Sequence, residues 1–310
     1  MGIDRRQEDT HVPVLYQEVS QWLMARNPQI VLDCTVGYGG HAEMLLRNSA
    51  PTMKLIGLDR DSKAIAFSQE RLMEFGARVI LRQGNYRDVK CHLAEIGVSE
   101  VGGILFDLGV SSPQLDDPAR GFSFQHDGPL DMRMDQTTGL TAAELVNGAR
   151  EHELADIIFQ YGEERYSRRI ARAIVREREQ GPIETTGVLA SIVAGAVPAV
   201  YRRGRIHCAT RTFQALRIAV NQELEGLASS LHDAADLLAQ GGRMCAISFH
   251  SLEDRIVKHE FRALSQRPDL GFSLLTKKPI LPTEEECRTN PRARSAKLRV
   301  AERVPGRMAQ

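Results

Sequence analysis

The sequence predicts an α/β protein: a doubly wound, mainly parallel sheet that is interrupted by an inserted all-helical domain. Strand and helix patterns alternate up to residue 108, about a hundred residues with helical patterns follow, and a strand pattern returns at 243–249. Alternating βα units form parallel sheets with right-handed crossovers. The interruption and the return therefore indicate one sheet domain with a helical insertion.

The elements before the interruption follow from their apolar periodicity. A helix at 16–24 precedes a short apolar strand, QIVLDCT at 29–35, and a glycine-rich turn, Gly37-Tyr38-Gly39-Gly40. Further strands are expected at 54–61, 78–83 and 101–108, with helices at 62–75 and 87–96. The last strand, VGGILFDL, is apolar enough to be buried on both faces.

After residue 108 the sequence is loop-like to Asp135 and then reads as helices at 141–147, 151–161 and 167–180. A long helical pattern runs from Ala209 to Gln240, where Gly241-Gly242 are expected to stop it. A strand at 243–249, a helix at 252–264 and strands at 272–277 and 296–301 would complete the sheet. We expect residues 1–115 and 209–310 to form the sheet domain and residues 116–208 the insertion.

The 310 residues carry no formal net charge, but the basic residues are clustered. Eleven arginines stand against three glutamates between Arg165 and Arg217, and seven basic residues stand against Glu302 between Arg288 and Arg307. Such segments indicate a surface that binds a polyanion, although solvated helix faces would give the same charge pattern in the sequence. We expect the insertion to be basic and to recognise RNA.

Targeting and redox signals are lacking. The most apolar stretch, Gly187 to Val200, contains Pro198 and is shorter than the roughly 20 residues that a bilayer requires. The mixed charges of MGIDRRQEDT do not resemble a secretory signal. Five scattered cysteines have neither zinc-site nor disulfide spacing. We therefore expect a cytoplasmic protein with reduced cysteines and no membrane contact.

The glycine turn leaves two cofactors open. Gly37-x-Gly39-x-x-Ala42 with Asp59 fits an NAD fingerprint as well as a methyltransferase loop. Asp33 and Asp107, at the ends of the first and fourth strands, would repel a pyrophosphate but favour the sulfonium and ammonium groups of S-adenosylmethionine. The charge pattern favours S-adenosylmethionine, while the alternative is that the acids only cap helices.

Blocks along the chain resemble the RsmH-type (MraW) small-subunit ribosomal RNA cytosine-N4 methyltransferases. The blocks are HVPVL at 11–15, DCTVGYGGH at 33–41, LDRD at 58–61, DLGVSSPQL at 107–115, GFSFQHDGPLDMRMD at 121–135, YGEER at 161–165, ATRTFQAL at 209–216, SFHSLEDR at 248–255 and NPRARS at 290–295. The resemblance implies a class I methyltransferase fold and methylation of a cytosine in the decoding region of 16S rRNA.

The resemblance also implies site residues. Cofactor contacts fall on Gly39, Gly40, His41, Asp59, Tyr86, Asp107 and Gln114, with Tyr86 standing where a Phe is also found. Asp107, or a backbone carbonyl of its turn, is placed to accept the N–H of a target amine. His250 is the second catalytic candidate, in the target pocket or as a proton shuttle, against the alternatives of a helix cap or a core residue.

Several other hypotheses can be weighed from the residues alone. Methylation at carbon 5 of cytosine would need a poised cysteine, and Cys34, the only one beside a cofactor motif, is more simply a small packing residue. Phe249 or Phe213 could stack on an extruded base. Asp127, Asp131 and Asp135 could suggest a metal, but Gly128 and Pro129 prevent a helix from aligning them.

We expect no metal, a 16S rRNA partner within the small ribosomal subunit, and a monomer or weak homodimer. A different class of function, an assembly factor that binds RNA without turnover, remains open at this point.

Overall fold

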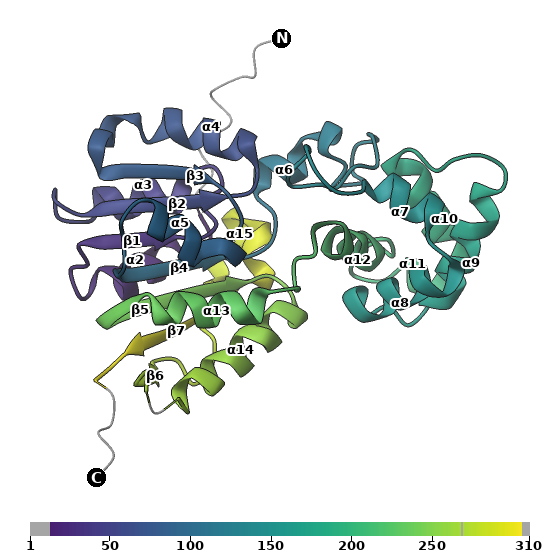
Figure 1. Cartoon of the computed structure of the whole chain (residues 1–310). Helices are drawn as coiled ribbons and strands as arrows, with labels where there is room; N and C mark the ends of the chain where they lie inside the picture. Colours follow the sequence, from purple (N-terminus) through teal and green to yellow (C-terminus); the bar gives the residue numbers. More distant parts are fainter. Residues whose placement is uncertain (1–12, 268, 306–310) are drawn as a thin grey trace. The chain divides into compact units, whose positions relative to one another are not determined.

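A computed structural model describes residues 13–267 and 269–305; His11 and Val12 of the first family block lie outside them. The chain divides into two compact units. One comprises the chain up to Gly109 and from Gly226 onward, and the other is Val110–Glu225. The first unit contains the seven-stranded sheet, and the second is built from helices and loops (Figure 1). The expected α/β class with a helical insertion is confirmed.

The strands of the sheet lie in the order β3-β2-β1-β4-β5-β7-β6. The first five strands by sequence pair in parallel, and β7 pairs antiparallel with both β5 and β6. The strands are β1 (Ile30–Asp33), β2 (Lys54–Asp59), β3 (Val79–Gln83), β4 (Val101–Asp107), β5 (Leu238–Ser248), β6 (Phe272–Leu274) and β7 (Lys297–Arg303).

This strand order, with one antiparallel strand between β5 and β6, is the class I methyltransferase arrangement. The chain builds outward from β1 to β3 and then starts again at β4 on the other side of β1. In open α/β sheets, ligands bind outside the carboxyl ends of the strands at such a switch point. The topology therefore predicts a ligand-binding site at the carboxyl ends of β1 and β4.

Each face of the sheet is covered by its own apolar cluster. Ile104 and Phe106 of β4 belong to one cluster with residues of α5, α13 and α14, whereas Leu105 belongs to another with residues of α2 and α3. Alternate residues of a strand point to opposite faces, so β4 is buried on both. The helices of this unit are α2 (Tyr16–Met24), α3 (Gly40–Arg47), α4 (Ser62–Arg71), α5 (Val89–Glu95), α13 (Leu227–Asp236), α14 (Ser251–Ser265) and α15 (Glu284–Thr289).

The second unit has a core of its own, to which Phe122, Leu154, Ile170, Leu189 and Leu216 contribute. None of the described helices is long and apolar enough to cross a bilayer. The helices of this unit are α6 (Ser112–Asp116), α7 (Ala142–Gly148), α8 (Glu151–Gly162), α9 (Ser167–Arg178), α10 (Thr186–Ala196), α11 (Ala199–Arg202) and α12 (Thr210–Asn221).

Two expectations about the insertion are wrong. Its boundaries are 110 and 225 rather than 116 and 208, because Ala209, Phe213 and Leu216, in and beside α12, are buried in the core of the second unit. The unit is also not basic as a whole, since it holds 14 arginines, no lysine and 16 acidic residues. The positive excess is confined to the part around Arg165–Arg217.

The expected helix from Ala209 to Gln240 is also wrong. α12 ends at Asn221 because Gln222 adopts a left-handed conformation (φ 51°), and Gly226 (φ 73°) begins a separate helix, α13. β5 has already begun at Leu238, so Gly241 and Gly242 lie inside a strand, beside the register shift between Val101 and Gly103 of β4. The glycines mark a strand irregularity instead of a helix end.

Buried polar contacts fix the loop 121–135 within the second unit. Asn221, at the end of α12, accepts a hydrogen bond from Met134 N (2.7 Å) and donates to Met132 O (2.7 Å). The Arg120 guanidinium is buried and donates to the carbonyls of Arg133 and Met134 (both 2.9 Å). These bonds satisfy backbone groups that would otherwise be buried without partners.

We predict that Asn221→Ala lowers the free energy of unfolding of the second unit by about 3 kcal/mol, because it leaves buried backbone groups unpaired. Urea denaturation followed by circular dichroism measures this. Asn48→Ala is the matched control, since Asn48 is exposed. Equal stability of the two variants would contradict the role assigned to Asn221.

Candidate active site

Three carboxylates and one imidazole gather at the carboxyl edge of the sheet. Asp33 is the last residue of β1, Asp59 of β2 and Asp107 of β4, and His41 lies in the first turn of α3. Parallel register brings the three strand ends together, since Asp33 pairs with Gly57 on one side and Leu105 on the other. The acids therefore lie at the strand ends where the sequence predicts them.

The turn that precedes α3 consists largely of glycines, so its backbone carries few side chains. Gly39, the residue before α3, has φ 79°, a conformation that side chains rarely adopt. A Cβ added at Gly40 would lie 2.7 Å from Pro13 Cγ. Ser68 Oγ fixes the turn by donating to Gly37 O (2.7 Å). The turn is therefore held in a conformation that leaves no room for side chains at these glycines, and backbone N–H groups at a helix N-terminus are suited to bind a ligand carboxylate.

Asp59 is held by backbone groups on both sides. Its Oδ2 accepts from Gly37 N (2.8 Å) and its Oδ1 from Asp61 N (2.9 Å). Burial raises the pKa of Asp59 to about 6 despite these bonds. Each oxygen retains a lone pair for a further donor, such as a ribose hydroxyl.

Asp33 is the most deeply buried of the three acids, with 1% of its surface exposed. Its Oδ1 accepts from Thr35 N (3.1 Å), but Oδ2 has no hydrogen-bond partner among the described residues. Burial raises the pKa of Asp33 to about 7, against the lowering effect of His41. A buried carboxylate that lacks a partner is costly unless a positive group accompanies it.

His41 and Asp107 form a pair beside Asp33. His41 Nε2 lies 3.3 Å from Asp107 Oδ2. Burial lowers the pKa of His41, but the carboxylates of Asp107 and Asp33 outweigh this effect and raise the pKa above its ordinary value. The backbone N of Asp107 donates to Thr35 Oγ1 (2.6 Å), which anchors the end of β4 to the β1 turn.

Buried polar atoms without partners therefore point to a ligand at this edge. Asp33 Oδ2, Asp107 Oδ1 and His41 Nδ1 are all buried and unpaired within the described chain. Buried polar groups are almost always hydrogen-bonded, so such a cluster needs an explanation. S-adenosylmethionine fits it, because its positive sulfonium and ammonium groups suit the two carboxylate oxygens.

Two further expected cofactor contacts, Tyr86 and Gln114, have partners of their own. Tyr86 follows β3, in the 3-10 turn Tyr86–Asp88, and packs edge-on against Phe106 (5.8 Å between centroids). Gln114 belongs to the second unit, where its Oε1 accepts from Ser111 N (3.0 Å) in a capping box at α6. Their contacts with the cofactor stay predictions.

His250 caps α14. Its Nδ1 accepts from Glu253 N (3.4 Å), and Glu253 Oε2 accepts from the backbone N of Phe249 (2.8 Å) and of His250 (3.3 Å). This is the helix-cap alternative raised for His250 from the sequence. The cap uses only Nδ1 of the ring, so the catalytic role of His250 stays a prediction.

Other candidate side chains have structural partners. Phe213 is buried in the core of the second unit beside Phe124 (4.8 Å), so it is not the open ring that stacking on a base requires. Asp127 accepts from Gly187 N (2.7 Å), at the start of α10. Asp131 binds Arg133 (2.8 Å), and Asp135 binds Thr137 (2.6 Å). Asp131 and Asp135 thus order their own loop, and Asp127 joins that loop to the start of α10.

Three residues that support the site, Thr35, Ser68 and Glu286, do not stand out in the sequence. Glu286 of α15 accepts from Leu15 N (2.7 Å), and its charge adds to the effects that raise the pKa of His41. This bond joins positions 271 residues apart, so no local pattern signals it. Glu253, by contrast, could have been found from its spacing of three residues after the cap.

The fold and the site together define a class I, S-adenosylmethionine-dependent methyltransferase. The strand order supplies the class, and the unpaired carboxylates at the switch point suit a positively charged methyl donor and would repel the diphosphate of NAD.

Comparison with known proteins leads to the family. The model of the MraW methylase family matches residues 8–304, so the chain belongs to that family. It is 54% identical over 294 residues to ribosomal RNA small subunit methyltransferase H of Synechococcus elongatus, covering 95% of each chain. It is 50% identical over 307 residues to the protein of that name from Citrifermentans bemidjiense, covering 95% of this chain and 98% of the relative.

We predict that the affinity for S-adenosylmethionine rises between pH 6 and pH 8, because the pKa of Asp33 is about 7 and only its ionised form attracts a cation. Asp33→Asn should bind about tenfold or more weakly at pH 8, a loss of roughly 1.4 kcal/mol, and with less pH dependence. Isothermal titration calorimetry at three pH values measures both effects.

The same substitution should stabilise the ligand-free protein at pH 8. A raised carboxyl pKa means that the favourable contribution of Asp33 is complete below about pH 4 and is lost as pH rises through about 7. Removing the charge therefore raises the melting temperature at pH 8 more than at pH 5. Asp236→Asn, which alters a surface ion pair with Lys90, is the control for binding. Unchanged affinity in Asp33→Asn would contradict the assignment.

Proposed function

We propose that this methyltransferase transfers the methyl group of S-adenosylmethionine to the N4 amine of a cytosine in the decoding region of 16S rRNA. The names of relatives at 50–54% identity support ribosomal RNA of the small subunit as the substrate. The motif resemblance supports the cytosine and its N4 atom. The observation that carries the proposal is the unpaired carboxylate oxygen of Asp107 beside the cation-favouring Asp33.

The cofactor supplies an activated methyl group, and the protein has to hold and orient both reactants. We assign its binding to Asp33 and Asp107, to Gly39 and Gly40 at the start of α3, to His41, and to Asp59, whose oxygens keep lone pairs for the ribose hydroxyls. Tyr86 and Gln114 complete the set that the family resemblance implies. None of these roles needs a metal.

Asp107 has the catalytic role in this proposal. The exocyclic amine of cytosine is conjugated with its ring, so an acceptor for its N–H bonds helps to localise the lone pair on nitrogen. Asp107 Oδ2 is oriented by His41, and Oδ1 is the free acceptor. A backbone carbonyl of the turn after Asp107 is the alternative acceptor.

Nitrogen is favoured over carbon as the methylated atom because the cysteine at the site is unsuited to attack. Cys34 is 1% exposed, and burial raises the pKa of its thiol well above the ordinary value, with Asp33 adding to the effect. The thiolate, not the thiol, is the nucleophile that methylation at carbon 5 requires. Cys34 is therefore assigned to packing.

The proposal also covers the form of the substrate, the cellular compartment and the oligomeric state of the enzyme. We expect the substrate to be 16S rRNA within the small ribosomal subunit, in the cytoplasm, and the enzyme to act as a monomer or weak homodimer. An RNA-binding assembly factor without turnover would use the same fold, and the turnover measurement below separates the two.

We predict that Asp107→Asn lowers the rate of methyl transfer to small-subunit particles at least 100-fold, as expected for an acceptor worth about 3 kcal/mol in the transition state. Radiolabelled S-adenosylmethionine measures the rate. The dissociation constant of the cofactor, measured separately, should rise by a smaller factor than the rate falls, because Asp107 is also one of the expected cofactor contacts. Full activity of Asp107→Ala would contradict the role of the side chain, and absence of turnover by the natural protein would contradict the whole proposal.

We predict that Cys34→Ala retains methyl transfer within about threefold, because no covalent bond to the base forms during methylation of nitrogen. Mass spectrometry of rRNA nucleosides from cells with and without this protein identifies the product. Loss of N4-methylcytidine is the expected result. Loss of 5-methylcytidine, together with inactivity of Cys34→Ala, would overturn the choice of nitrogen.

A further inference from the structure

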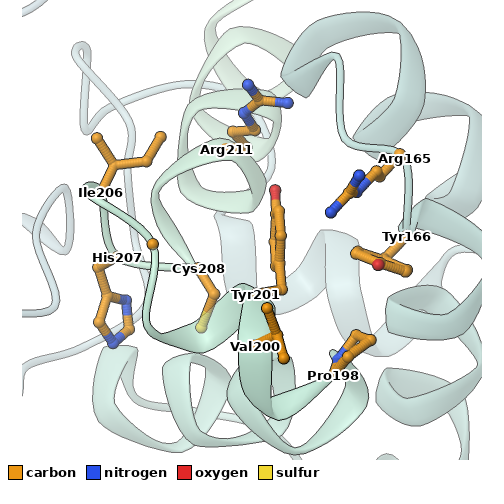
Figure 2. A pocket seen from close by; sticks show the side chains of 10 residues that line it. Arg165, Tyr166, Pro198, Val200, Tyr201, Ile206, His207, Cys208 and Arg211 are labelled. Carbon is orange, nitrogen blue, oxygen red and sulfur yellow. The ribbon is translucent and has the colours of Figure 1, made fainter.

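The second unit contains a cavity of about 260 Å³ that the proposed chemistry does not use. It lies between the start of α9, the segment around α11 and the start of α12, so three parts of the sequence contribute to it. Figure 2 shows Tyr201 in its middle, with Arg165 and Tyr166 on one side and His207 and Cys208 on the other. The lining residues are Arg165, Tyr166, Pro198, Val200, Tyr201, Gly204, Ile206, His207, Cys208 and Arg211.

Two tyrosines form a fixed aromatic wall in this cavity. The rings of Tyr166 and Tyr201 meet edge to face, with centroids 5.0 Å apart. Tyr201 donates its hydroxyl to Glu164 Oε2 (2.5 Å), and Glu164, which is fully buried, also accepts from Tyr166 N (2.8 Å). Burial, together with Glu164, raises the pKa of Tyr201 to about 12, so the ring stays neutral. The wall is preorganised, which reduces the entropy cost of binding.

Two guanidinium groups lie at the hydroxyl end of Tyr201 (Figure 2). Arg165 stacks over both rings, 4.8 Å from the centroid of Tyr166 and 5.0 Å from that of Tyr201. Arg211 donates from one nitrogen to Glu163 O (2.8 Å). Neither guanidinium has a carboxylate within 4 Å in the described part of the chain, so both have donors available for an anion.

Apolar side chains beside these guanidinium groups are exposed to solvent. Val200 is 85% exposed and Ile206 49% exposed, and His207 packs on Phe124 (4.6 Å between ring centroids). Arg202, Arg203 and Arg205 of the same segment are exposed as well. An aromatic and apolar surface next to unpaired guanidinium groups suits a group that is flat at one end and anionic at the other, as a nucleotide is.

We propose that this cavity binds one unpaired nucleotide of the RNA substrate, separate from the cytosine that is methylated. Its base packs against Tyr201 and the apolar rim, and its phosphate binds Arg165 and Arg211. The volume lies just under the roughly 300–1,000 Å³ of typical small-molecule sites, which suits a ligand of the size of one nucleotide. This inference rests on the proposed RNA substrate and adds a second point of recognition to it.

The test compares pocket and control variants in the full chain. Arg165→Gln with Arg211→Gln removes both guanidinium groups, and Arg172→Gln with Arg176→Gln removes two exposed charges of α9 that do not line the cavity. The probe is fluorescein-labelled hexacytidylate, and fluorescence anisotropy gives its dissociation constant over a range of salt concentrations. The affinity for S-adenosylmethionine reports that each variant is folded.

We expect the pocket variant to bind the probe at least tenfold more weakly, while the control changes it less than about threefold. The slope of log K against log salt should fall by about 0.7 in the pocket variant, which corresponds to one lost phosphate contact on a single strand. A hexamer carrying 4-thiouridine should crosslink to Tyr201, Ile206 or His207 of the natural protein under ultraviolet light.

Equal losses in the two variants would reduce the cavity to part of a general positive field and overturn the proposal. Loss of binding to small-subunit particles without loss of hexamer binding would indicate a protein contact and overturn it too. If the natural protein bound the hexamer through the cavity but methylated no small-subunit RNA, the proposed function would fail and the nucleotide site would stand.

Discussion

The burial of carboxylates at the ends of parallel strands is the constraint on which the site depends. Asp33 is almost inaccessible to solvent and lies close enough to Asp59 and Asp107 for their charges to raise its pKa further. Removing charge from water is costly, and like charges add to that cost. The fold tolerates the arrangement because His41 and the backbone N–H of Thr35 compensate part of it, and a cationic ligand would compensate the rest.

The backbone of the glycine turn is held in place by side chains. Ser68 and Asp59 fix the two ends of Gly37, and Thr35 ties the first turn to the end of β4. Groups that are already oriented lose little entropy when a ligand arrives, and they need no rearrangement during reaction. The positioning of Asp107 by His41 follows the same logic, since it leaves one carboxylate oxygen oriented and free.

The arginines of the second unit differ in whether their guanidinium groups are used for contacts within the unit. Arg120, Arg178 and Arg217 are used internally, against carbonyl groups or the carboxylate of Glu223. Arg165 and Arg211, by contrast, stand at an aromatic wall without a carboxylate partner within 4 Å among the described residues. The unit as a whole is slightly acidic, so its net charge does not show which guanidinium groups are available; the local pairing of each guanidinium decides whether it could bind a phosphate.

The sequence by itself determined the alternating strands, the glycine turn and the acids at three strand ends, because apolar periodicity and Gly or Asp at an element boundary are local signals. Only the tertiary structure decided that the long helical pattern is divided at Gln222 and that α12 packs in the core of the second unit. It also decided that His250 caps a helix and that Phe213 is a core residue. It also revealed Glu286 against Leu15 and the cavity around Tyr201, since both join segments far apart in the chain. Pairing, burial and the absence of a partner are properties of packing, and no local pattern encodes them.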